Sequence, residues 1–135
     1  MKKSKMVVVA FAVALLVPSS TFASSTFAAG EWDYLGSDVF TNQSKNFKSG
    51  GGDFAICLSA DSKSSYYQLF EEDPFNPDDK VGSGLYFKTA GSNDFDAEGC
   101  HIFRDIGGFV DGTDDQAEFY LAKYSSGNSS VRAWD

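Results

Sequence analysis

Basic charge is scarce in this sequence of 135 residues. The chain has 11 Lys and Arg residues against 19 Asp and Glu residues, which gives a net charge of −8 and an isoelectric point of about 4.5. A protein that follows nucleic-acid phosphates needs a basic face, so this composition excludes nucleic acid as a partner. The hydrophobic fraction of 42% and the aromatic fraction of 16% are too high for an intrinsically disordered chain.

Recognisable catalytic motifs are also missing. The chain has one histidine, His101, and lacks a Gly-x-Ser-x-Gly elbow, a His-Glu-x-x-His helix and any group of several histidines. We interpret a lone histidine in a strand-like run as structural. The sequence therefore predicts no catalytic residue and a protein that is not an enzyme. A carboxylate pair for glycoside hydrolysis stays as an alternative, because acids are abundant.

The first 28 residues have the pattern of a bacterial secretory signal. An apolar run from residue 7 to 17 follows a basic start, made by Lys2, Lys3 and Lys5. A run of 11 residues is too short to cross a bilayer as a helix but suits a signal-peptide core. We predict cleavage after Ala28, with Ala23 as the alternative site. An uncleaved membrane anchor is the competing interpretation.

Removal of residues 1–28 leaves a single domain, residues 29–135, that we predict to be secreted and extracellular, without stable membrane insertion. Its net charge is −11, because the three signal lysines are lost and no acid is lost with them. Cys57 and Cys100 are the only cysteines and lack the C-x-x-C spacing of a thiol redox centre. In an oxidising compartment we expect them to form one disulfide.

Helical periodicity is hard to find after residue 30, whereas strand-like runs are frequent. In residues 117–122, Ala117, Phe119 and Leu121 alternate with outward residues, as in a half-buried strand. A glycine-rich turn signal at 82–84 is typical of those that separate the runs. About seven short strands predict an all-β fold, a single antiparallel β-sandwich, with a small barrel as the alternative. The expected strands are 32–35, 53–58, 66–70, 85–88, 100–103, 117–122 and 131–134.

Aromatic residues are numerous, with 13 Phe, 6 Tyr and 2 Trp. Large rings allow a small domain to bury enough apolar area, so we assign most of them to the core. A carbohydrate platform built from Trp32, Trp134 and surface tyrosines is the alternative for the rest.

Acidic residues gather between the expected strands, first in residues 71–82. A loop that presents several carboxylates can surround Ca²⁺, which takes 6–8 oxygen ligands. Residues 66–82 resemble the third calcium loop of C2 domains, where a strand leads into acid-x-acid, a spacer and Asp-x-aliphatic-Gly. The matching positions are Glu71, Asp73, Asp79, Val81 and Gly82. The resemblance implies a calcium-binding β-sandwich with Glu71, Asp73 and Asp79 as metal ligands.

A second acidic cluster has the spacing of an EF-hand loop. Acids stand at positions 1, 3, 5 and 12 and glycine at position 6, as Asp94, Asp96, Glu98, Asp105 and Gly99. We interpret this segment as a free-standing calcium turn with those four acids as candidate ligands. A third cluster, residues 111–115, could add ligands to either site. The competing interpretation of all three clusters is solvation, because acidic loops keep an exported protein soluble and blunt sheet edges.

These features favour a secreted, non-enzymatic β-sandwich binding module with Ca²⁺ as its candidate cofactor. Its expected partners are cell-wall polymer, carbohydrate or a surface protein. The alternative from another class is a secreted antagonistic protein, such as a bacteriocin, a toxin or an inhibitor, because small size, a disulfide and secretion fit it equally well. A small glycoside hydrolase is the third hypothesis. The ligand-binding residues and the oligomeric state are not predicted.

Overall fold

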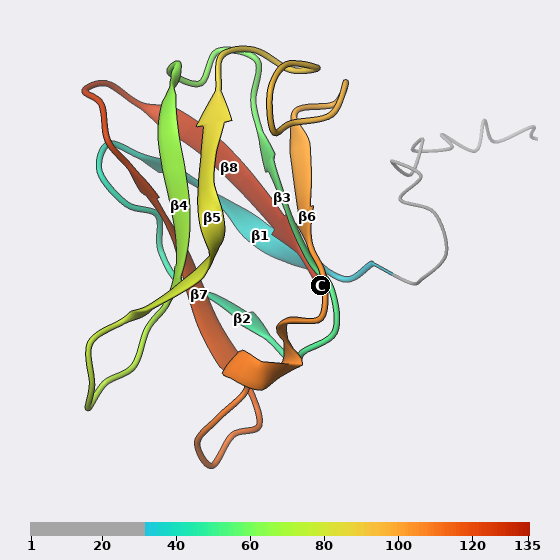
Figure 1. Cartoon of the computed structure of the whole chain (residues 1–135), viewed down its shortest axis with the longest axis vertical. Coiled ribbons are helices and arrows are strands. Elements are labelled where there is room, and N and C mark those ends of the chain that lie inside the picture. Colours follow the sequence, from blue (N-terminus) through green and yellow to red (C-terminus); the bar gives the residue numbers. More distant parts are fainter. Residues whose placement is uncertain (1–31) are drawn as a thin grey trace, which may run out of the picture.

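Alternating and continuous apolar runs form strands in this chain, as the computed structural model of residues 32–135 shows (Figure 1). The predicted signal at 1–28, with both candidate cleavage sites, and residues 29–31 lie outside the described residues. Within the described part, one turn of 3-10 helix, η1, accompanies eight strands. The elements in chain order are β1 (Tyr34–Phe40), β2 (Phe47–Ser49), β3 (Phe54–Leu58), β4 (Ser65–Glu71), β5 (Asp79–Phe87), β6 (Cys100–Phe103), η1 (Ile106–Phe109), β7 (Ala117–Lys123) and β8 (Ser129–Trp134).

The strands form two sheets of four, and every pair of neighbours is antiparallel. The first sheet has the order β1-β8-β3-β6 and the second has the order β2-β7-β4-β5. Figure 1 shows the two sheets as layers, and the main cluster of buried apolar residues draws on both of them. The predicted all-β antiparallel sandwich is therefore confirmed. Within residues 32–135 there is no helix of the length and apolarity that a bilayer crossing requires.

The core follows directly from the sequence pattern. All five residues of β3 are buried, because this strand runs between β8 and β6 and is covered on both faces. In β7 every second residue is buried, as the alternation predicts. Phe54 of the first sheet meets Phe119 of the second with ring centroids 4.9 Å apart. Between the layers, the Tyr67 hydroxyl lies 2.6 Å from the Ser129 hydroxyl and donates to the Lys63 carbonyl at 2.7 Å.

Three details differ from the predicted strand pattern. The first strand runs over Tyr34–Phe40 and not over 32–35, because pairing with β8 continues to Phe40. The three-residue strand β2 was missed, because so short a segment carries no readable period. The predicted turn at 82–84 was wrong, since these residues lie inside β5. There Gly82 has a φ of +66° and the register with β4 shifts, so the glycines mark a β-bulge.

The predicted disulfide is confirmed, and it joins two neighbouring strands. Cys57 on β3 lies directly opposite Cys100 on β6, and their Cα atoms are 3.9 Å apart. Both residues are buried, with exposed fractions of 2% and 4%. Because β6 is a short edge strand that pairs only with β3, the bond fixes that edge of the first sheet.

Replacement of both cysteines in a Cys57→Ala/Cys100→Ala variant should lower the free energy of unfolding by about 4 kcal/mol. The bond closes a loop with a sequence separation of 43 residues, and the chain-entropy model assigns that value to a loop of this size. Urea unfolding of the two proteins measures the difference. A strong reductant present throughout should bring the wild type down to the variant, and a loss below about 1 kcal/mol would contradict this account.

Candidate functional site

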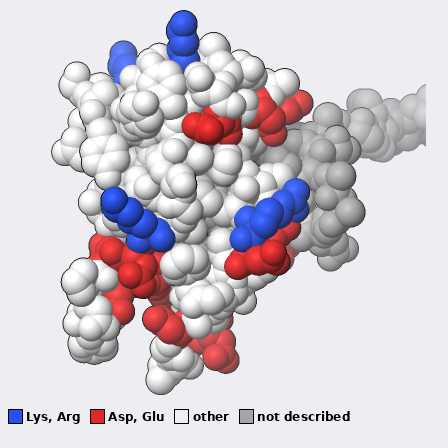
Figure 2. Space-filling model, in the orientation of Figure 1, with Lys and Arg blue, Asp and Glu red and all other residues white. Residues whose placement is uncertain are grey.

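Two of the three acidic clusters meet at one end of the sandwich. The β4–β5 loop and the segment between η1 and β7 both extend from the lower end of the sandwich in Figure 1, and Figure 2 shows acidic side chains at that end. Pairing of Glu71 with both Asp79 and Phe119 brings β5 and the start of β7 to the end of β4. The third cluster thus approaches the first and not the second. We call this group the Glu71 pole and define it as Glu71, Asp73, Asp79, Asp111 and Glu118.

Glu71 is the central residue of this pole because its side chain points into the sandwich. It follows Tyr67 and Leu69 at steps of two along β4, and those two residues belong to the core. Only 2% of Glu71 is exposed, and its Oε1 atom is buried without a hydrogen-bond partner. Asp79 and Phe119 are its direct cross-strand neighbours and share its face of the sheet. The Glu71 carboxyl group therefore lies where the apolar core between the two sheets ends.

The surroundings of Glu71 oppose its ionisation. Burial raises its pKa from 4.5 to about 7, and the negative charges of Asp111, Asp73, Asp79 and Glu118 add to the rise. Near neutral pH the group is therefore shared between its protonated and its charged form, unlike an ordinary surface glutamate.

Asp73 organises the β4–β5 loop. Its Oδ1 accepts hydrogen bonds from the Phe75 and Asn76 backbone N–H groups at 2.9 and 3.1 Å, and its Oδ2 accepts one from the Asn76 side chain at 2.9 Å. The bond from the Asn76 side chain, followed by that from the Phe75 backbone, lowers the pKa of Asp73. This predicted metal ligand thus uses its oxygen atoms to hold its own turn.

Glu118 belongs to the pole although the sequence analysis did not select it. Lys48 Nζ lies 3.8 Å from Glu118 Oε1 and 3.8 Å from Asp114 Oδ2. Burial raises the pKa of Glu118, and the charge of Asp114 adds to this effect. In residues 32–135 no ion pair involves Glu71, Asp79 or Asp111. Glu118 precedes Phe119, the cross-strand partner of Glu71, and faces the other side of the sheet. Only the pairing of β4 with β7 brings it near Glu71, so no local sequence signal could have identified it.

The second acidic cluster is divided by strand β6. Asp94 Oδ2 accepts a hydrogen bond from the Tyr86 backbone at 2.8 Å, while Asp96 Oδ1 accepts bonds from the Glu98 and Cys100 backbones. Figure 1 shows the loop before β6 and the chain after it at opposite ends of this strand. The predicted ligands Asp94, Asp96 and Glu98 precede β6, whereas the fourth, Asp105, follows it. A strand about 13 Å long therefore separates them from Asp105.

Asp105 has a separate local role. Its backbone N–H donates to Asp53 Oδ1 at 3.0 Å, and it precedes η1 with a φ of 54°. The EF-hand spacing therefore does not gather its four acids in space. Across residues 32–135, no three His, Cys, Asp or Glu side chains are grouped to hold a metal ion in their present positions.

The outer surface of the second sheet carries a group of aromatic side chains. Tyr66 and Tyr124 are 61% and 65% exposed, and the Tyr124 backbone N–H donates to the Tyr66 carbonyl. The rings of Tyr66 and Tyr86 have centroids 4.9 Å apart, and those of Phe70 and Tyr120 stack at 5.4 Å. We call this surface the tyrosine face and define it as Tyr66, Phe70, Tyr86, Tyr120 and Tyr124.

The centre of the tyrosine face carries no charged side chain. Gln68 lies between the aromatic pairs, where its side-chain amide donates to the Leu69 and Val81 carbonyls and is buried. Beside it, Gly82 and Gly84 leave exposed backbone on β5 without side chains. Figure 2 shows a largely uncharged surface over β4 and β5. The face thus offers rings and backbone groups to a ligand.

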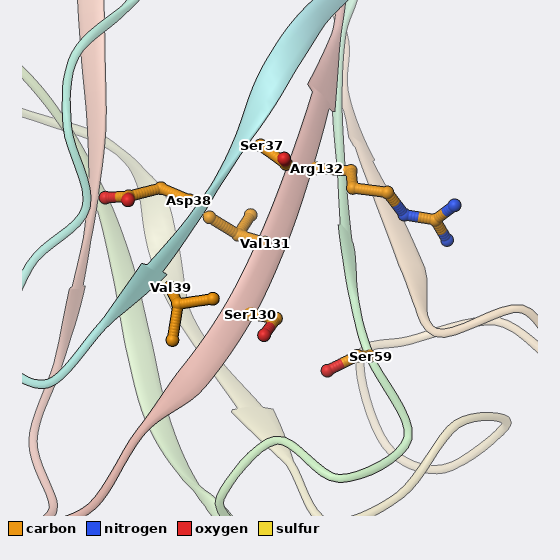
Figure 3. Close-up of a pocket in the computed structure, with 7 residues that line it drawn as sticks. All are labelled: Ser37, Asp38, Val39, Ser59, Ser130, Val131 and Arg132. Carbon is orange, nitrogen blue, oxygen red and sulfur yellow. The ribbon is translucent and has the colours of Figure 1, made fainter.

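A groove of about 570 Å³ lies on the opposite surface, along β1 and β8 (Figure 3). Val39 is exposed there, and Figure 3 shows Arg132 extending over β3, away from the serines. The Arg132 guanidinium and the Tyr34 ring each lie 5.4 Å from the Trp134 ring. Trp134 lies on β8 and therefore belongs to the other sheet from the tyrosine face. The groove is lined by Ser37, Asp38, Val39, Ser59, Ser130, Val131 and Arg132.

A Glu71→Gln variant should be more stable than the wild type at high pH and similar to it at low pH. The folded-state pKa of about 7 exceeds the ordinary value of 4.5, so the wild type loses stability as pH rises through this window. The difference should reach about 3 kcal/mol by about pH 8. Urea unfolding between about pH 4 and 8 measures it. A Glu98→Gln control alters an exposed acid of the other cluster and should follow the wild type, and parallel curves for Glu71→Gln and wild type would refute the explanation.

Comparison with known proteins gives a family for the chain. Residues 34–133 match the family model described as the YndA coiled coil domain. The chain is 41% identical over 114 residues to the uncharacterized protein YndA of Bacillus subtilis (strain 168), an alignment that covers 83% of this chain and 80% of that protein. No solved structure matches significantly. A coiled coil needs long α-helices, whereas the matched residues form strands and one 3-10 turn. By this match, and despite its strands, the chain belongs to the YndA coiled coil domain family.

Proposed function

We propose that this protein is a secreted, non-enzymatic binding module that contacts an uncharged carbohydrate of the cell wall or cell surface. The observation that carries the proposal is the tyrosine face, a group of aromatic side chains on the outer surface of the second sheet. Secretion itself rests on the signal pattern of residues 1–28 and is supported by the disulfide, a bond that persists in oxidising compartments.

The geometry of the tyrosine face suits a sugar chain. Tyr86, Tyr66 and Tyr124 come from the adjacent strands β5 and β4 and from the end of β7, so they follow one another across the sheet at steps of about 4.8 Å. That step is close to the length of a hexose unit. The C–H groups on one side of a pyranose ring pack against aromatic rings, while the tyrosine hydroxyls hydrogen-bond to sugar hydroxyls.

Charge favours an uncharged ligand over a polyanion. The whole chain carries −8, and removal of the predicted signal would make it −11. Phosphate-rich wall polymers would be repelled by such a protein at low ionic strength. An uncharged glycan meets no such barrier, and a sheet surface that is already ordered loses little conformational entropy on binding.

Pull-down with insoluble glycans tests the proposal, with peptidoglycan stripped of anionic polymers, chitin and cellulose as the probes. The wild type should bind at least one of them. A Tyr66→Ala/Tyr86→Ala variant should bind about thirtyfold more weakly, because the two rings contribute roughly 1 kcal/mol of contact each. Tyr34→Ala is the matched control, an exposed tyrosine on the other sheet that should leave binding unchanged. Absence of binding to all three polymers, or equal binding by the double variant, would reject the tyrosine face as the site.

A second candidate function, a secreted antagonist that binds a target protein, is favoured by Phe75. This side chain is 92% exposed at the tip of the β4–β5 loop. Besides the turn held by Asp73, Asp78 Oδ1 accepts a bond from the Asp73 backbone and Asp78 Oδ2 accepts one from the Tyr120 hydroxyl at 2.6 Å. An exposed ring on a loop held at both ends is a suitable anchor for a pocket in another protein.

Growth inhibition separates this second candidate from the first. Purified protein added to cultures of related bacterial species should slow growth if the chain is an antagonist, and Phe75→Ala should abolish the effect without changing the melting temperature. No effect on any species tested would remove this candidate and leave the carbohydrate proposal intact.

A further inference from the structure

Glu71 occupies a position that is unusual for a charged residue. It lies on the inward face of β4, where its exposed fraction is 2%, and no hydrogen bond reaches Oε1. Buried polar atoms without a partner are rare, because desolvation of such a group is costly. The Glu71 carboxyl points inward at the end of the core, and its Oε1 atom has no hydrogen-bond partner. A positively charged ligand would compensate for the desolvation of this group.

Two further carboxylates flank Glu71 from different segments. Asp79 is its direct neighbour across the β4–β5 pair, on the same face of the sheet. Asp111 follows Val110, which packs against the core cluster, so the start of the η1–β7 segment is anchored to the core. Both aspartates are exposed, whereas Glu71 is buried. Both are close enough for their negative charges to raise the pKa of Glu71.

Basic side chains do not neutralise this arrangement. Lys48 pairs with Asp114 and Glu118, and Arg104 pairs with Asp53. Within residues 32–135 these pairs leave Glu71, Asp79 and Asp111 without an ion-pair partner. When Glu71 is charged, a neutralising cation therefore has to come from solution.

We propose that Glu71, Asp79 and Asp111 bind a divalent cation, with Ca²⁺ as the preferred ion. Carboxylate oxygens are hard ligands, and Ca²⁺ accepts the irregular geometry and added water ligands that groups from a strand end and a loop provide. The described side chains are not already gathered around one point, so binding would turn the exposed Asp79 and Asp111 towards Glu71. Their mutual repulsion keeps such groups apart until a cation joins them.

This site differs from both sites suggested by sequence spacing. Asp73 is committed to its own turn, and Asp105 lies across β6 from its expected partners. Asp111, by contrast, comes from the cluster to which the sequence assigned no site of its own. The proposal is independent of carbohydrate binding, because the tyrosine face is on the outer surface of the sheet while Glu71 points inward.

Calorimetric titration of the full chain with CaCl₂ at about pH 8, where Glu71 is largely charged, tests the site. The wild type should bind one Ca²⁺ with a Kd of about 10⁻⁴ to 10⁻³ M, a range usual for extracellular modules, and its melting temperature should rise. Glu71→Gln should weaken binding at least about tenfold although the variant stays folded. Asp111→Asn should weaken it as well, while the control Glu98→Gln should bind like the wild type.

Three results would overturn the site. The first is the absence of both heat and thermal stabilisation when the wild type meets about 10 mM CaCl₂, a concentration above the expected Kd. The second is equal stabilisation by NaCl at matched ionic strength, and the third is undiminished binding by Glu71→Gln, since either would assign the effect to general screening of acidic charge. Thermal melting of Glu71→Gln without Ca²⁺ shows in the same experiment that its fold is intact.

Discussion

The pairing register of β4 between β5 and β7 is the constraint on which the rest of this structure depends. Side chains alternate between the two faces of a strand, so the register that buries Tyr67 and Leu69 also turns Tyr66 outward and Glu71 inward. A slip of one residue would exchange the two sets and expose the core. The tyrosine face and the Glu71 pole are therefore two consequences of the same alternation along β4, whose register with β7 runs without a shift.

The acidic residues of the chain have two different structural roles. Asp73, Asp94 and Asp96 accept hydrogen bonds from nearby backbone N–H groups, so their charge stabilises the turns between strands. Glu71 makes no comparable bond through Oε1 and is instead crowded by other acids. Spacing in the sequence does not separate these roles, because a turn-forming aspartate and a metal-binding aspartate occur in the same kind of loop.

The family description and the fold point in different directions, and the fold has a clear physical basis. Residues 34–133 match a model described as a coiled coil, yet β3 is a continuous apolar run and β7 has a period of two. A coiled coil requires an apolar repeat of seven residues over several turns of helix. The disulfide between paired strands is also consistent with a sheet, because it joins residues 57 and 100, which lie directly opposite each other.

The sequence by itself determined the fold class, the strands with a strong period and the cysteine pair, because these depend on local alternation and on having only two thiols. It also placed Phe119 and Leu121 on the buried face of their strand. It could not determine that Gly82 belongs to a bulge, that Asp105 lies far from Asp94, or that Asp111 approaches Glu71. Those facts depend on which strands pair and in what register, and pairing between distant segments is decided only when the two sheets pack around a common core.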